Sequence, residues 1–159
     1  MLYKKPSSSS QQSRNSKRSY KKEAPSEVFE ARNVTKTFDA ISSLLREIHS
    51  KSLDYLRRID HPTRRVFKVT QALWALANSS VEDSRVQPWR VIKQILTKET
   101  LHSILAIDHS KVDPSLIRTL FEEFIHDRSW DICKISKESQ TIGIMAQWLS
   151  VLCVLVCLR

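Results

Sequence analysis

The side chains that could carry out acid–base or metal chemistry in this sequence are few, and their spacing does not bring them together. Glu122 and Glu123 are adjacent, so on a helix they point to different sides instead of converging on one substrate. His102 and His109 are seven residues apart with only Asp108 beside them, which is typical of surface or core histidines. This pattern does not indicate a catalytic or metal site.

The cysteines and the single glycine exclude further classes of site. Cys133, Cys153 and Cys157 form no C-x-x-C pair and have no histidine at zinc-ligand spacing. Cys153 and Cys157 also lack a basic neighbour that would activate a thiolate, and an odd number of sparse cysteines indicates reduced thiols in an intracellular protein. With 1 Gly in 159 residues, a Gly-rich phosphate-binding loop cannot form. We therefore expect a non-catalytic protein without a cofactor, a metal or a small-molecule substrate.

Positive charge is concentrated near the N-terminus. The net charge is +9, and residues 1–24 hold seven Lys/Arg against one Glu, so most of the excess lies there. These residues are rich in serine and polar side chains that cannot bury a core, which predicts a disordered basic tail. The tail has no apolar stretch typical of a signal peptide. Its charge favours non-specific contact with a polyanion, and binding of nucleic acid through residues 1–22 is one alternative function.

Residues 25–60 are expected to form a long, coiled-coil-like helix. Ser26 is a suitable N-cap, and apolar residues then recur in alternating steps of three and four through residues 31–59. Such a stripe needs a partner helix, which is either another chain or a part of this chain against which the helix folds back. The predicted coiled-coil face consists of Val34, Phe38, Ile41, Leu45, Ile48 and Tyr55.

Residues 61–159 are expected to form a small, all-α helical domain. Pro62 ends the first helix, and Thr63 caps a helix over residues 64–77. Residues 78–86 read as a polar loop, Pro88 suits a first helical position, and Asp113 caps a helix that starts with Pro114. One last helix is expected after residues 129–131. The predicted core includes Val66, Val69, Trp89, Ile92, Leu105, Ile107, Gly143, Met145 and Trp148.

The only glycine lies inside the last, apolar helix. A glycine there costs roughly 1 kcal/mol relative to alanine, so we expect another backbone or a bulky ring to lie against Gly143. The run of residues 142–158 is mostly apolar and uncharged, and it is close to the length that spans a membrane. Two interpretations remain open for this run, a tail anchor and a helix buried in the domain core.

Three stretches share their order and spacing with a known family. In the first stretch, residues 53–62, a coiled-coil-like helix ends at a proline. The second stretch, residues 89–96 followed by 101–108, contains a Trp, a Lys and a Leu in order and then an apolar residue directly before Asp108. The third stretch has the spacing of Ser139, Gly143, Met145 and Trp148. Together, over residues 45–153, the sequence resembles the stalk tip of dynein heavy chains, a helical microtubule-binding domain between two antiparallel coiled-coil helices.

The resemblance implies docking on microtubules, in the cytoplasm and cytoskeleton and in a cilium or axoneme. By this likeness Arg64, Arg65 and Lys68 on the first globular helix would attract the acidic tubulin surface, together with Lys111 and Arg118 near the third globular helix. The sequence departs from the family in three places. Phe67 stands where a basic residue is usual, Glu122 and Glu123 would weaken docking, and the returning coiled-coil helix is replaced by the apolar run.

A second interpretation is a helical scaffold protein that pairs through its heptad face without binding tubulin. A third is a tail-anchored membrane protein that uses residues 142–158.

Overall fold

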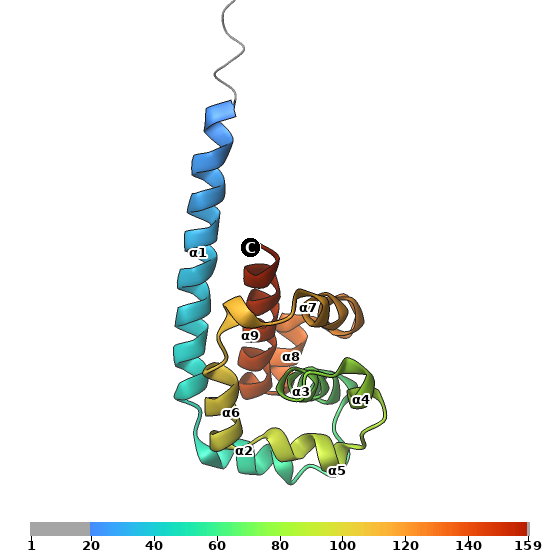
Figure 1. The fold of residues 1–159 in the computed structure, drawn as a ribbon. Helices are drawn as coiled ribbons and strands as arrows, with labels where there is room; N and C mark the ends of the chain where they lie inside the picture. Colours follow the sequence, from blue (N-terminus) through green and yellow to red (C-terminus); the bar gives the residue numbers. More distant parts are fainter. Residues whose placement is uncertain (1–19, 159) are drawn as a thin grey trace, which may run out of the picture. The chain divides into compact units, whose positions relative to one another are not determined.

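The computed structural model describes the backbone of residues 20–158 and the side chains of residues 31–158. The chain divides into two units, residues 1–33 and residues 34–159, and the second contains the folded domain (Figure 1). The all-α prediction is confirmed for the described residues, which contain helices and no strand. The helices are α1 (Tyr20–Arg46), α2 (Ser50–Arg57), α3 (Arg64–Ala77), α4 (Val81–Arg85), α5 (Trp89–Ile92), η2 (Lys93–Ile95), α6 (Lys98–Leu105), η3 (His109–Lys111), α7 (Pro114–Leu120), η4 (Phe121–Ile125), α8 (Ile132–Glu138) and α9 (Gln140–Cys157).

The first helix starts earlier and ends sooner than its pattern predicts. Ser26 lies inside α1 and is not its cap, because α1 starts at Tyr20. The predicted tail covered residues 1–24. Residues 1–19 lie outside the described part of the chain, and residues 20–24 belong to α1. The helix also does not reach residue 59, because the chain turns between Arg46 and Ser50. Leu53 and Leu56 of α2 are then buried, whereas Tyr55 is 69% exposed and lies on a different helix from the predicted face residues of α1.

The part of α1 that belongs to the domain packs against α9. Ile41, Leu45 and Ile48 are buried in the domain core, and the Phe38 ring lies 5.5 Å from that of Trp148. Trp148 Nε1 donates a hydrogen bond to Ser42 Oγ at 3.0 Å. The apolar stripe from Phe38 to Ile48 therefore meets its own domain, while Val34 is only half-buried.

The α3 helix forms where it is predicted, between Thr63 and Asn78. Thr63 Oγ1 accepts a hydrogen bond from the Val66 amide at 3.2 Å, which satisfies one of the free N–H groups at the helix start. The loop predicted over residues 78–86 is partly wrong, because α4 forms there with its cap at Ser80. Gln71 Nε2 donates to the Ser84 carbonyl at 2.9 Å, and this buried bond joins α4 to α3.

Ser79, just after α3, has φ of 53°, in the left-handed region that favours glycine. Ser80 N donates to the Ala75 carbonyl at 3.0 Å, so the turn closes the end of α3. We expect Ser79→Gly to raise the free energy of unfolding by about 0.5–1 kcal/mol, since glycine adopts this conformation without strain. Urea denaturation would measure it, with Ser79→Ala as the matched control that gains nothing. An unchanged or lower stability for the glycine variant would contradict this expectation.

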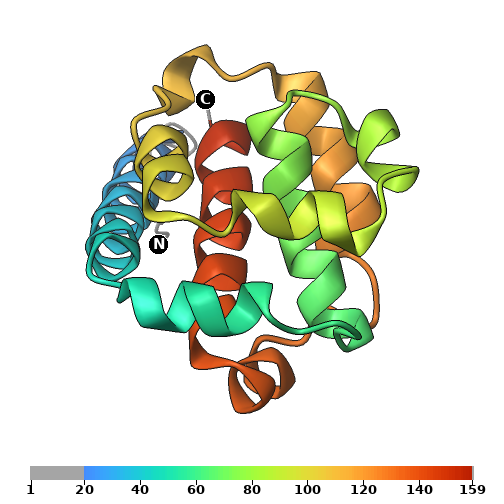
Figure 2. The same ribbon diagram turned by 90° about the horizontal axis from the view of Figure 1, so that it is seen from below.

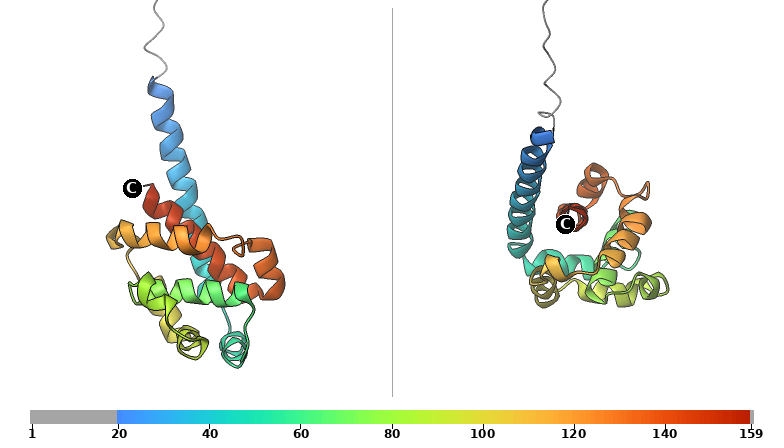
Figure 3. Two further views of the ribbon diagram at one scale, coloured as in Figure 1. Left: turned by 90° about the vertical axis from the view of Figure 1, so that its right-hand side faces the viewer. Right: turned by 45° about the horizontal axis from the view of Figure 1, so that its top comes forward.

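The end of the chain forms two helices instead of one. Asp113 caps α7 as predicted, and Pro114 occupies the first turn of the helix. The helix then continues into the π-helical turn η4, where the His126 amide donates to the Phe121 carbonyl at 2.9 Å. The single last helix is wrong, because Ser139 ends α8 and caps α9 by accepting from the Ile142 amide at 3.2 Å. The two helices pack tightly against each other (Figure 3).

The expected close approach at Gly143 is confirmed. A Cβ atom placed there would lie 2.9 Å from Ser136 Cα and would also collide with Ser136 Oγ. The backbone of α8 therefore occupies the space that any side chain at this position would need. Glycine is tolerated inside α9 because it lets the two helices approach each other.

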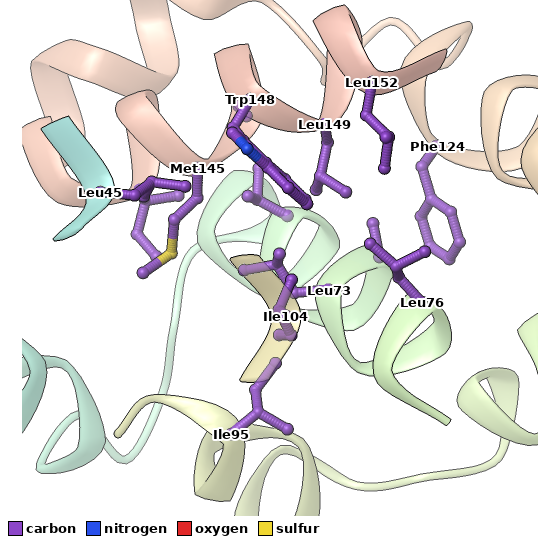
Figure 4. Close-up of a cluster of buried hydrophobic side chains, with 14 of the residues drawn as sticks. Leu45, Leu73, Leu76, Ile95, Ile104, Phe124, Met145, Trp148, Leu149 and Leu152 are labelled. Atoms are coloured by element: carbon purple, nitrogen blue, oxygen red, sulfur yellow. The ribbon is translucent and has the colours of Figure 1, made fainter. Parts of the chain in front are cut away.

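The helix α9 lies at the centre of residues 34–159, beside α3 (Figure 2). It is long and apolar enough to cross a membrane, yet 56% of it is buried in the domain. Figure 4 shows Trp148, Leu149 and Leu152 facing side chains of α3, α6 and η4. Of the two interpretations of residues 142–158, this arrangement fits the core helix.

Most of the predicted core is buried. Trp89 is half-buried and donates from Nε1 to the Ile59 carbonyl at 2.6 Å, and Leu105 is half-buried at the end of α6. Ile107 is 38% exposed, so its core assignment was wrong; it follows the end of α6, where the helical register no longer points it inward. The buried members of the predicted set are Val66, Val69, Ile92, Gly143, Met145 and Trp148.

Candidate functional site

Three cations project from the first turns of α3. The Arg64 side chain is 73% exposed, whereas those of Arg65 and Lys68 are 31% and 25% exposed. The N-terminus of a helix carries a partial positive charge, so cations there are unfavourable unless anions lie close. This end of the domain therefore needs carboxylates from elsewhere in the chain.

Two carboxylates supply this charge. Glu138, at the end of α8, accepts hydrogen bonds from Thr63 Oγ1 at 2.7 Å and from Arg65 Nη1 at 2.9 Å. Asp127 Oδ2 lies 3.6 Å from Arg64 Nη2 and 3.9 Å from Lys68 Nζ. Arg65 is thus held by a direct hydrogen bond, whereas Arg64 is held only loosely.

Asp127 is fixed by its own turn. Its Oδ1 accepts from the Ser129 hydroxyl at 2.6 Å and from the Ser129 amide at 2.8 Å. These two bonds, assisted by Lys68 and Arg64, hold the pKa of Asp127 below its usual value. The carboxylate therefore stays ionised at neutral pH, with Oδ2 directed to the cations. Lys68 Nζ also lies 5.4 Å from the centre of the Phe124 ring, within the range of a cation–π contact.

The segments that meet at this end keep a positive excess. Residues 64–68 and 126–138 together contain six Lys/Arg and three Asp/Glu. Arg128, Lys134 and Lys137 are exposed, and they have no ion pair within the part of the chain that the structure describes. Exposed ion pairs contribute little energy, so the exposed Arg64 can also exchange its carboxylate partner readily. We call this surface, residues 64–68 with 126–138, the α3 basic end; it is suited to attract a broad anionic surface.

The other two predicted cations lie elsewhere. Lys111 is 83% exposed and lines the same hollow as Leu76 and Ala77, at the C-terminal end of α3. Because α3 has 14 residues, its two ends are about 20 Å apart. Arg118 is exposed on α7. Lys111 precedes α7 and Arg118 lies on it, so both stand near the third globular helix and apart from Arg64, Arg65 and Lys68.

Glu123 forms an ion pair with Arg85, with Arg85 Nε 3.0 Å from Glu123 Oε2. Its charge is thus compensated within the domain, and Glu122 remains exposed. The expected weakening of docking by these glutamates therefore rests mainly on Glu122.

Sequence reasoning missed Asp127 and Glu138, which complete the α3 basic end. A signal for the first was present, since Asp-x-Ser recurs at Asp108, Asp113 and Asp127, and in each case the serine two residues on donates to the carboxylate. No local pattern identifies Glu138, which meets Thr63 and Arg65 only through the fold.

The remaining reactive side chains do not assemble into a site. Burial, with a smaller contribution from Cys157, raises the pKa of Cys153 to about 12, so its thiol stays protonated. His109 packs edge-on against Phe38, with ring centres 5.7 Å apart, and His102 is exposed. Among the described residues no group of three His, Cys, Asp or Glu side chains could hold a metal ion.

Comparison of the sequence with known protein families and with curated proteins finds no match.

Proposed function

We propose that the chain is a non-catalytic helical docking module, similar to a dynein stalk tip, that binds the acidic surface of a microtubule through the α3 basic end. The observation that supports it most is the exposed cation cluster around Arg64, which keeps a positive excess after its internal ion pairs are counted. Opposite charge on the two partners would speed their encounter and orient the domain. By the same resemblance the protein would act on the cytoskeleton, in a cilium or axoneme.

The helices α1 and α9 meet through a small set of buried contacts. Phe38 and Ser42 of α1 contact Trp148 of α9, and Leu45 lies beside Met145 (Figure 4). The order of these contacts runs in opposite directions along the two helices, so they are antiparallel where they meet. The two coiled-coil helices of a stalk tip are also antiparallel, but α9 is a helix of the domain core and does not take the place of the returning one.

The proposal predicts that charge reversal at the α3 basic end weakens microtubule binding. We expect Arg64→Glu/Arg128→Glu to lower the affinity in co-sedimentation by about ten-fold or more at low salt, because both side chains are exposed and neither packs in the core. The matched control is Lys36→Glu/Arg46→Glu, which changes the net charge by the same amount at exposed positions of α1, outside the α3 basic end. The control should keep binding close to wild type.

Three results would speak against the proposal. If both double variants lose binding equally, net charge alone causes the attraction and the α3 basic end is not the docking surface. If the wild-type protein is helical by circular dichroism but does not sediment with microtubules, the domain is not a microtubule-binding module. If removal of residues 1–19 alone abolishes binding, the basic tail causes it.

A further inference from the structure

A groove unrelated to the α3 basic end crosses the opposite end of α3. Two hollows, of about 520 Å³ and 320 Å³, share Ser79, Asp113 and Leu116 as lining residues, so they lie side by side. Each volume falls in the range of ligand pockets. We call them together the α3–α7 groove, because α3, α4 and α7, which enclose them, pack against each other.

The floor of the groove is apolar and partly open to solvent. Ile107 is 38% exposed, Ala77 is exposed, and Leu76 and Leu116 complete the surface between them. An exposed isoleucine beside an open apolar hollow leaves area that a ligand side chain could cover.

The rim of the groove carries an excess of negative charge. Glu82, Asp108 and Asp113 are exposed carboxylates there. Ser110 and Ser115 donate to the two aspartates through hydroxyl and amide groups, and these bonds lower the pKa of both carboxyls, which stay ionised. The two cations that line the groove, Arg85 and Lys111, do not neutralise this negative charge.

Lys111 Nζ lies 3.9 Å from Asp108, and the guanidinium of Arg85 pairs with Glu123. Glu82 and Asp113 are left without a cation among the ion pairs of the described residues. An occupant with positive charge would therefore complement the rim.

We infer that the α3–α7 groove is a docking site for a short, extended peptide segment of a partner protein in which basic residues alternate with apolar ones. Successive side chains of an extended chain point to opposite sides, so apolar residues can enter the larger hollow while lysines or arginines lie against the carboxylates of the rim. The inference is independent of microtubule binding, because it uses a different surface with the opposite charge.

Fluorescence anisotropy of the full chain tests this inference with three labelled seven-residue peptides, in which Lys alternates with Leu, Lys with Ser, and Glu with Leu. We expect the Lys–Leu peptide to bind about ten-fold or more tightly than either of the others, because it alone satisfies both floor and rim. Equal binding of the Lys–Ser peptide would overturn the inference, since charge alone would then explain the attraction.

Ala77→Arg places a long cation on the groove floor. Ala77 is the last residue of α3 and is exposed, and a cation at a helix C-terminus is favourable, so the variant should fold normally. It should weaken binding of the Lys–Leu peptide by about ten-fold. The matched control is Ala106→Arg, which makes the same change at the exposed end of α6, outside the groove. Unchanged binding by Ala77→Arg, or equal loss in both variants, would overturn the inference.

Discussion

Replacing Trp148 with alanine is expected to lower the free energy of unfolding by about 3–5 kcal/mol, a large fraction of the stability of a domain this size. The side chain is 2% exposed, at the centre of the core that Figure 4 shows. Its removal would open a cavity between α1 and α9 and would leave the Ser42 hydroxyl without the donor that it now has. Thermal denaturation followed by circular dichroism would measure the loss, which we expect to exceed about 10 °C in Tm.

Two milder variants separate packing from hydrogen bonding at this position. Trp148→Phe keeps a ring against Phe38 but removes the indole N–H, and Ser42→Ala removes only the acceptor at 3.0 Å. Each should cost about 1–3 kcal/mol, clearly less than Trp148→Ala. If Trp148→Ala cost no more than Ser42→Ala, the indole would not be a packed core residue.

The second large effect is expected at Gly143. Alanine there would gain about 1 kcal/mol in helix propensity, but its Cβ would lie 2.9 Å from Ser136 Cα, and a backbone atom cannot turn aside. The helices α8 and α9 would have to separate, so we expect Gly143→Ala to cost about 2 kcal/mol net. Urea denaturation with a constant m value would measure it.

Ser136 supplies the control for this clash. Ser136→Ala alone should be nearly neutral, since the Ser136 side chain is only half-buried. Combined with Gly143→Ala it should recover part of the loss, because the hydroxyl no longer collides, while the contact with Cα remains. A neutral or stabilising Gly143→Ala would show that the two helices are further apart than described.

Elements marked by local chemistry were predictable from the sequence. Thr63 and Asp113 cap α3 and α7 as expected, since a hydroxyl or carboxylate before an apolar stripe is a local signal. The break between α1 and α2 has no such signal, because Glu47, Ile48 and His49 include neither Pro nor Gly. The turn brings Leu53 and Leu56 of α2 into the hydrophobic core, which no local residue pattern indicates.

The candidate docking surface was predictable only in part. Arg64, Arg65 and Lys68 stand close together in the sequence, so their cluster was visible there. The carboxylates that restrain them were not, since Glu138 lies 73 residues from Arg65.

The hydrogen bond between Ser42 and Trp148 joins residues 106 positions apart, whereas α8 and α9 are linked by Ser139 alone. Closing a chain loop costs entropy that grows with its length, so the α8–α9 hairpin is inexpensive to form and the α1–α9 contact is costly. Local contacts also form faster than distant ones. We therefore expect the hairpin to be an early event in folding, and the attachment of Phe38–Ile48 to α9 to be the late step that completes the domain.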